Sequence, residues 1–182
     1  MADEFTDQAE YERISIDMEK MGRNGIWTGV DKRYKDLEKL GVNIQFDHYV
    51  LGAQAAQELG DILECKKRLS EALEIKPKKK QLKLWYEAID NNYGYVALFA
   101  TSKKVAALER QNMVADPVHQ KAIAFAQQSL DKNGEFEGMI PIGEYNFSGQ
   151  KFRLRAGIAV QLDISSRMRR LELNKKQKEK GE

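Results

Sequence analysis

Residues 58–77 read ELGDILECKKRLSEALEIKP, and this stretch contains the clearest structural signal in the chain. Gly60 and Asp61 are residue types that favour turns. The apolar residues after them recur at helical spacing for about four turns, and Pro77 cannot continue a helix. The stretch therefore predicts the end of one helix, a tight turn and a second helix that stops before the proline.

Residue size follows a pattern in these two helices. Small residues stand where two helices would cross closely, namely Ala53 and Ala56 in the first helix and Cys65 and Ala72 in the second. Leu69 is large and stands where a following helix would dock. Small and large residues placed in this way predict a closely packed helical hairpin.

Counted back from Pro77, these positions give residues 44–77 the register of a tetratricopeptide (TPR) repeat, which the segment resembles. Gly52 stands where the family has leucine, and Tyr49 where it usually has tryptophan. A helical hairpin without repeat ancestry is the alternative. The resemblance implies a scaffold that binds another protein, because repeat arrays present extended binding surfaces.

A weaker copy of the pattern lies upstream. Gly25 precedes Gly60 by 35 positions, close to the TPR period of about 34. Apolar residues at helical spacing flank Gly25 and recur after Pro77: Ile14, Met18 and Met21; Val30, Tyr34, Leu37 and Leu40; Leu82, Trp85 and Ile89. Residues 1–90 are therefore expected to form about two and a half TPR-like units.

Composition limits the class of protein. The 182 residues are 42% hydrophobic and 32% charged, with a net charge of +2, which fits one domain or two small ones and gives no general attraction to nucleic acid. Cys65 is the only cysteine, so an intramolecular disulfide is impossible and a small buried thiol is expected. No apolar run reaches the roughly 18 residues of a membrane span, and the acidic start Met1-Ala2-Asp3-Glu4 lacks a signal-peptide pattern. We therefore expect a cytoplasmic protein.

Beyond residue 90 the periodicity changes from helical to strand-like. Strands are predicted at 95–99 and 105–108, and a hairpin at 145–147 and 151–155 around a Ser-Gly-Gln turn. Residues 160–164, VQLDI, alternate apolar and polar side chains, as a half-buried edge strand does. These segments predict a small sheet.

One helix is predicted within this β region. Asp116 has the residue type of an N-cap, and Pro117 suits the first helical position. Lys132-Asn133-Gly134 is expected to end the helix, and its buried face is expected to hold Ile123, Ala126 and Leu130. Helices first and strands later predict an α+β fold with TPR-like repeats at 1–90, a β module with one helix at 91–166 and a basic tail at 167–182.

A second resemblance lies in the β region. The run Pro141-Ile142-Gly143-Glu144-Tyr145, followed by Gly149, Phe152, Leu154, Gly157 and Val160, resembles the β-sandwich modules called PEGA domains. The order of a TPR array, a strand, a helix and a hairpin resembles TPR proteins of gliding or predatory delta-group bacteria. This resemblance implies a bacterial cell-polarity or motility regulator, with a polarity protein such as a small Ras-like GTPase as the partner.

The chain has no arrangement typical of catalysis. His48 and His119 lie about 70 residues apart, and neither has a second ligand at metal-binding spacing. Residues 22–25 lack the Gly-Lys-Ser/Thr ending of a phosphate-binding loop, and Ser148-Gly149 has the residue types of a turn. We therefore expect a non-enzyme that needs no cofactor or metal.

The expected binding surface is the concave face of the helical repeats. By TPR register this face would carry nine residues: Glu12, Ser15, Glu19, Asp47, Val50, Gln54, Gln57, Leu84 and Ala88. It lacks the Lys/Asn/Arg set with which co-chaperone TPRs bind a terminal carboxylate. Its acidic and polar character favours a basic or neutral partner segment, unless the β module covers the face.

The C-terminal tail offers a second surface. Residues 167–182 contain seven Lys/Arg and three Glu, a net charge of +4, which leaves −2 for the rest of the chain. Such a run is usually a solvated terminus, and without interleaved aromatic residues nucleic-acid binding is disfavoured. Met168 and Leu171 could instead dock the tail on the body or on a second subunit.

Three functions therefore remain open. They are a protein-binding adaptor or scaffold, a binder of anionic polymers or membrane surfaces through the tail, and a homo-oligomeric structural protein in which Trp85 and Tyr86 cover a partner copy.

The TPR register makes a prediction about packing. Ala53→Trp and Ala72→Trp each place a large ring where two helices cross and should lower the free energy of unfolding by about 1–3 kcal/mol. Urea unfolding measures the change. If both variants are as stable as the parent chain, the register is wrong.

Overall fold

The computed structural model describes residues 2–100, 106–112 and 116–164. The basic tail at 167–182 lies outside the described residues. By its internal contacts the chain divides into two compact units, 1–89 and 90–182. The first is helical and the second contains the strands, so the predicted α+β class is confirmed.

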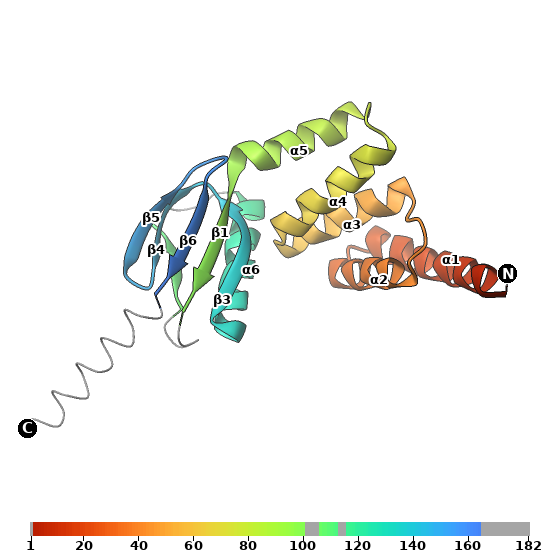
Figure 1. The fold of residues 1–182 in the computed structure, drawn as a ribbon, viewed down its shortest axis with the longest axis horizontal. Coiled ribbons are helices and arrows are strands. Elements are labelled where there is room, and N and C mark those ends of the chain that lie inside the picture. The colour runs from red at the N-terminus through yellow and green to blue at the C-terminus, as the bar shows by residue number, and fades with distance from the viewer. Residues whose placement is uncertain (1, 101–105, 113–115, 165–182) are drawn as a thin grey trace, which may run out of the picture. The chain divides into compact units, whose positions relative to one another are not determined.

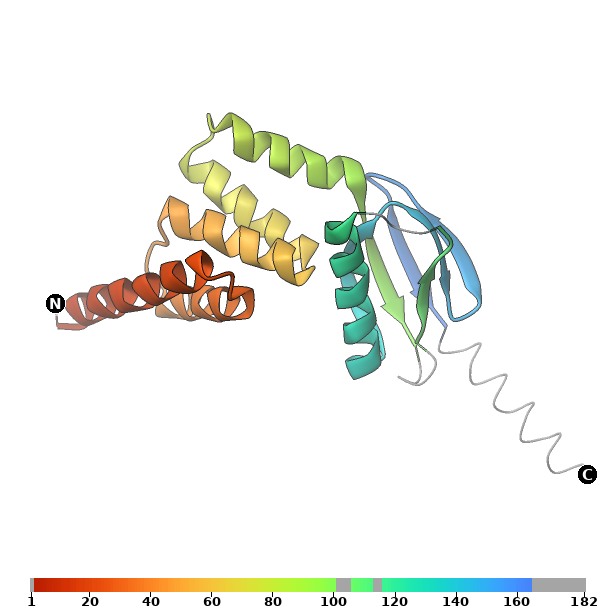
Figure 2. The same ribbon diagram turned by 180° about the vertical axis from the view of Figure 1, so that it is seen from behind.

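The first unit consists of five helices (Figure 1), which are α1 Ala2–Arg23, α2 Trp27–Leu40, α3 Phe46–Leu59, α4 Ile62–Ile75 and α5 Lys80–Asn92. The helices α1 and α2 pack as one hairpin and α3 and α4 as the next, with α2 against α3. The reverse view shows the same succession (Figure 2). The turns fall where Gly25 and Gly60 predict them.

The turn between α3 and α4 follows from its two residues. Gly60 has φ 90°, a left-handed conformation that glycine adopts without steric cost. The Asp61 carboxylate accepts a hydrogen bond from the Glu64 backbone N–H at 3.1 Å and so caps α4. The predicted crossing residue Cys65 is fully buried, and burial raises the pKa of its thiol to about 12. The thiol therefore stays protonated and unreactive near neutral pH.

A buried arginine joins three of these helices. Arg68 of α4 is fully buried, and its Nη1–H donates to the Gly52 carbonyl oxygen of α3 at 2.8 Å. Its guanidinium lies over the Tyr34 ring of α2, 3.9 Å from the ring centre. It also donates to Glu64 at 3.1 Å and to Asp31 at 2.8 Å. Each of the three guanidinium nitrogens therefore has a hydrogen-bond acceptor, as a buried charge requires.

Gly52 is the residue that leaves room for this stack. A Cβ atom at Gly52 would lie 2.4 Å from Tyr34 Cδ2. The leucine expected there from the TPR pattern would collide with the ring. Glycine replaces the expected leucine at position 52 because the Tyr34 ring occupies the space of a side chain there.

Asp31 accepts hydrogen bonds from both the buried Arg68 and the exposed Lys35. Its carboxylate accepts from Lys35 Nζ at 2.7 Å and from Arg68 Nη2 at 2.8 Å. Burial would raise the pKa of Asp31, but the hydrogen bonds from Lys35 and Arg68 outweigh it and lower this pKa. A carboxyl whose pKa is lower in the folded chain adds stability above its ordinary pKa. That stability is lost as the pH falls through the folded-state pKa.

The second unit contains α6 Pro117–Asn133 and two sheets of three strands each. The first sheet has the order β3-β1-β6, from β1 Tyr93–Phe99, β3 Glu135–Pro141 and β6 Ala159–Asp163. The second has the order β2-β4-β5, from β2 Leu108–Arg110, β4 Gly143–Phe147 and β5 Gln150–Leu154. Only the β1–β6 pairing is parallel among these strands.

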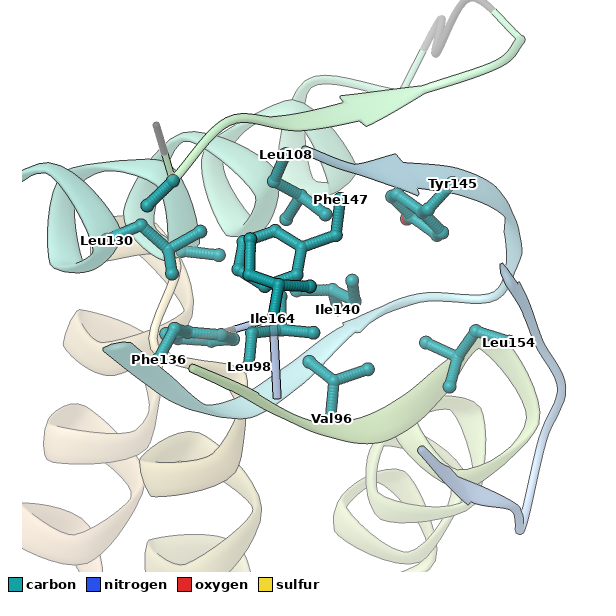
Figure 3. Close-up of a cluster of buried hydrophobic side chains, with 12 residues drawn as sticks. Val96, Leu98, Leu108, Leu130, Phe136, Ile140, Tyr145, Phe147, Leu154 and Ile164 are labelled. Carbon is teal, nitrogen blue, oxygen red and sulfur yellow. The ribbon is translucent and has the colours of Figure 1, made fainter. Parts of the chain in front are cut away.

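The core of this unit lies between the two sheets and α6. Figure 3 shows Val96 and Leu98 of β1 facing Phe147 of β4, with Leu130 of α6 beside them. Leu154 of β5 and Ile164 after β6 complete it. All of these side chains are fully buried or nearly so, and they hold the sheets together through the hydrophobic effect.

Several sequence predictions for this unit are confirmed. Asp116 caps α6 by accepting from the Val118 N–H at 2.8 Å, and Gly134 ends it with φ 77°. Ala126 and Leu130 are buried, whereas Ile123 is half-buried. β6 lies at the edge of its sheet, as its alternating pattern predicts.

Other predictions for this unit are wrong. The strand expected at 105–108 begins only at Leu108, because the β4 partners Tyr145, Asn146 and Phe147 pair with 108–110. Residues 135–141, where no strand was predicted, form the full strand β3, paired with β1. The strands form two sheets and not one. In the part of the chain that the structure describes, no helix combines the length and apolar character needed to cross a bilayer.

The Tyr34 stack makes Gly52 sensitive to a single methyl group. Replacing a glycine within a helix by alanine usually stabilises it by roughly 0.5–1 kcal/mol. Gly52→Ala should instead destabilise the chain by about 1–3 kcal/mol in urea unfolding, because the ring under Arg68 has no room to move. Gly29→Ala is the matched control, since its Cβ would meet the flexible end of Met21. An equal change in the free energy of unfolding for Gly52→Ala and Gly29→Ala would mean that the Tyr34 ring can move aside.

Candidate partner-binding surface

A hollow of about 320–340 Å³ lies on each unit, and the one on the first unit coincides with part of the predicted face. One hollow of the first unit, here called the α1–α3 hollow, has a volume of about 340 Å³. Its lining comes from three helices: Glu19, Gly22 and Arg23 of α1, Trp27 of α2, and Leu51 and Gln54 of α3. Trp27 and Leu51 are half-buried. The hollow therefore offers apolar surface beside a carboxylate, a guanidinium and an amide.

The nine residues predicted for the binding face differ in how exposed they are. Six are exposed: Glu12, Glu19, Asp47, Gln54, Leu84 and Ala88. Val50 and Gln57 are half-buried. Ser15 is only 6% exposed, so it belongs to the helix packing and not to the surface. Of the nine, Glu19 and Gln54 are the two that line the hollow.

An exposed isoleucine adds to this surface. Ile16 is 64% exposed and lies on α1 between Glu12 and Glu19, at the four- and three-residue spacings that share a helix face. On α3, Val50 precedes Gln54 by one turn. A single exposed isoleucine is common on protein surfaces, and it bears on binding only together with the apolar surface of the hollow. We call the exposed side of α1 and α3, with the hollow, the α1–α3 face.

Glu19 also takes part in a buried hydrogen-bond chain. The Gln45 N–H donates to the Tyr11 hydroxyl oxygen at 2.9 Å, and the same oxygen lies within hydrogen-bond distance of His48 Nδ1, at 2.8 Å. On the other side of the ring, His48 Nε2 lies 3.4 Å from Glu19 Oε1. The chain fixes the separation of α1 and α3 beside the hollow.

The charges on the two helices are mainly negative. The helix α3 contains Asp47 and Glu58 and neither lysine nor arginine. On α1, Glu12 and Glu19 are exposed, and Arg23 is the one basic residue that lines the hollow. Acidic side chains in this arrangement attract a basic segment and repel a carboxylate.

The helix α5 contributes only part of the predicted face. Trp85 Nε1–H donates to Gln57 Oε1 at 2.6 Å, so the Gln57 amide oxygen is engaged within the unit. Lys66 lies over the Tyr86 ring at 5.0 Å. Leu84 is 54% exposed. Trp85 and Tyr86, considered in the sequence for contact with a second copy, thus make contacts inside their own unit.

A second hollow, of about 320 Å³, lies on the sheet β2-β4-β5 of the other unit. Charged and polar side chains dominate it, including Glu144, Lys151 and Arg153. Arg153 and Glu144 approach to 4.0 Å, a weak exposed pair. No residue of the predicted binding face lies here.

The two histidines have structural partners. His48 belongs to the chain with Tyr11 and Glu19, and His119 packs edge-on against Tyr93, with Asp116 Oδ2 at 3.7 Å. Among the described residues, no group of three His, Cys, Asp or Glu side chains could hold a metal ion. The absence of an enzymatic function remains a prediction.

Sequence reasoning missed four residues of the hollow and the isoleucine beside it. Gly22, Arg23, Trp27 and Leu51 come from three helices, and only their packing brings them together. Trp27 offered one signal, since it follows the Gly25 turn directly and aromatic residues are enriched at interfaces. The others have no distinguishing pattern in the sequence.

Comparisons with known proteins give no match: no protein-family model matches the chain, and no curated protein or solved structure does so.

The buried hydrogen-bond chain can be tested at Tyr11. Tyr11→Phe leaves the Gln45 N–H and His48 Nδ1 without this hydroxyl and should lower the free energy of unfolding by about 1–3 kcal/mol, the cost of unsatisfied buried polar groups. Tyr86→Phe is the control, because it keeps the ring under Lys66. Urea unfolding of both variants gives the comparison. An equal loss in the two variants would mean that the Tyr11 hydroxyl does not hold the helices.

Proposed function

We propose that this protein is a non-catalytic, cytoplasmic adaptor that binds a partner protein through the α1–α3 face. The single observation behind the proposal is the hollow in which Trp27 and Leu51 lie beside Glu19 and Gln54. Helical hairpins of this kind serve as binding scaffolds. The partner segment would carry an apolar side chain next to a lysine or arginine.

The chemistry of the hollow supports this choice of partner. An apolar side chain would remove surface of Trp27 and Leu51 from water, and Ile16 next to the hollow would be covered as well. A neighbouring cation would meet Glu19, and the Trp27 ring can also attract a cation. A partner with a terminal carboxylate would meet Glu12, Glu19 and Asp47 and be repelled.

The partner's identity rests on resemblance alone. The order of TPR-like helices and β module resembles that of delta-group bacterial TPR proteins, so a cell-polarity protein such as a small Ras-like GTPase is the first candidate to test. The β module, as a second docking surface, belongs to the same proposal. Binding of anionic polymers or membrane surfaces through the tail is the rival function.

The experiment is an affinity capture with the full-length chain as bait, at about 50 and about 200 mM salt. Gln54→Arg places a cation beside the hollow, and Ile16→Asp places a charge on its apolar neighbour. Each should reduce recovery of the partner at least about tenfold, a loss of about 1.4 kcal/mol. Mass spectrometry identifies and quantifies the captured protein.

Two matched substitutions in the other unit serve as controls. Gln128→Arg and Ile158→Asp make the same changes at exposed positions of the β module that do not line its hollow. They should retain the partner at both salt concentrations. A partner lost equally from all four variants would contradict binding at the α1–α3 face. Recovery of only nucleic acid or lipid, lost at the higher salt, would favour the rival function.

A further inference from the structure

The loop between α4 and α5 concentrates positive charge on the helical unit. Residues 76–83 contain no acidic residue and five lysines, all of them exposed: Lys76, Lys78, Lys79, Lys80 and Lys83. Lys76 Nζ lies over the Phe46 ring, 4.0 Å from the ring centre. Within the described part of the chain, the other four lysines make no ion pair. With the flanking Glu74 and Glu87, residues 74–87 carry five lysines and two glutamates, a net charge of +3.

The loop also exposes apolar surface. Ile75, the last residue of α4, is 48% exposed, and Pro77 is exposed close by in sequence. A hollow of about 440 Å³ lies on the loop, lined by Lys76, Pro77, Lys78 and Lys79. Figures 1 and 2 show the loop at the periphery of the helical unit. Apolar and cationic side chains thus occur together at an accessible point.

The lysines lie at an electrostatically unfavourable place in the fold. The helix α5 begins at Lys80, and its first turn contains no acidic residue. The N-terminal end of a helix carries partial positive charge and favours carboxylates, so lysines there lower the stability of the helix. A departure from such a local preference, without compensation inside the fold, is expected at functional sites. An anionic surface against the loop would supply the missing negative charge.

We propose that the α4–α5 loop docks the helical unit on an anionic lipid surface. Lysine stems can lie along apolar surface while their ammonium groups reach lipid phosphates. Ile75 and Pro77 would enter the boundary between headgroups and acyl chains, where apolar burial adds to electrostatic attraction. This role goes beyond the proposed adaptor function, because no residue of the loop belongs to the α1–α3 face.

The residue types favour lipid over other polyanions. Nucleic-acid sites usually add arginines for base contacts or aromatic rings for stacking, and residues 74–83 contain neither. An acidic protein segment is usually held in a groove between elements of secondary structure or along a strand edge. The hollow on the loop is instead lined by four consecutive residues. A lipid surface requires only that the lysines and apolar side chains are exposed together.

Co-sedimentation of the full-length chain with vesicles measures the docking. The vesicles contain equal parts of phosphatidylserine and phosphatidylcholine, and phosphatidylcholine alone is the neutral control. Each lysine near an anionic leaflet adds about fivefold in affinity, so K78E/K79E/K80E/K83E should weaken binding at least about hundredfold. Urea unfolding should show this variant to be as stable as the parent chain or more so, because carboxylates suit the start of α5.

A tail variant provides the matched control. K175E/K176E/K178E/K180E makes the same change in charge, but residues 174–182 contain no apolar side chain that could enter the lipid. It should weaken vesicle binding less than about tenfold. The comparison separates docking through the loop from the rival function of the tail.

A fluorescent label locates the contact. Cys65 is the only cysteine and is fully buried, so an introduced surface cysteine reacts selectively. Nitrobenzoxadiazole at Pro77→Cys should brighten and shift to shorter wavelength on phosphatidylserine vesicles, because the label enters an apolar environment. Leu63→Cys is the control position, in the first turn of α4 and roughly 20 Å away along the helix. The label there should not respond.

Several results would overturn the inference. They are equal loss of binding in the loop and tail variants, equal binding to neutral vesicles, and a label response at position 63 but not at 77. Tight binding of a labelled DNA duplex, lost in the loop variant, without binding to vesicles would also overturn it and assign the loop to nucleic acid. The proposed adaptor function would stand in each case, since Gln54→Arg and Ile16→Asp test it with a protein partner.

Discussion

The helical unit depends on the burial of one charge. The guanidinium of Arg68 lies fully buried against the Tyr34 ring, and its donors reach the Gly52 carbonyl oxygen, Asp31 and Glu64. Burying an ion pair costs about as much desolvation energy as the attraction returns, so the contact adds little net stability. It acts instead on specificity, because any other register of α2, α3 and α4 would leave a buried cation without partners.

The geometry of the proposed binding surface depends on this packing. Arg68 holds α3 to α2 and α4, and the chain from Gln45 through Tyr11 and His48 to Glu19 holds α3 to α1. The hollow lies where α1, α2 and α3 meet, so its lining residues are positioned by rigid helices and not by loops. A face of this kind can hold a short segment without reorganising, which lowers the entropic cost of binding.

The sequence was informative where local chemistry decides structure. Turns at Gly25 and Gly60, the Asp116 cap and the edge strand at 160–164 depend on residues close together in the chain, and they were correctly predicted. The strand at 135–141 was missed because its sequence, EFEGMIP, contains a glycine and a proline and does not alternate strictly, and only pairing with β1 determines it. On the predicted face, Ser15 fits the register but is buried, since helical spacing alone cannot distinguish the edge of the packed side from the exposed side.

The order of helices and strands, the small residues at the helix crossing and the acidic character of α1 and α3 follow from the sequence alone, because each depends on composition and short-range periodicity. The charge of the tail does as well. The role of Gly52, the burial of Arg68 and the meeting of Trp27, Leu51 and Glu19 in one hollow required the tertiary structure. These features join residues that are far apart in sequence, and only the packing of one helix on another brings their side chains into contact.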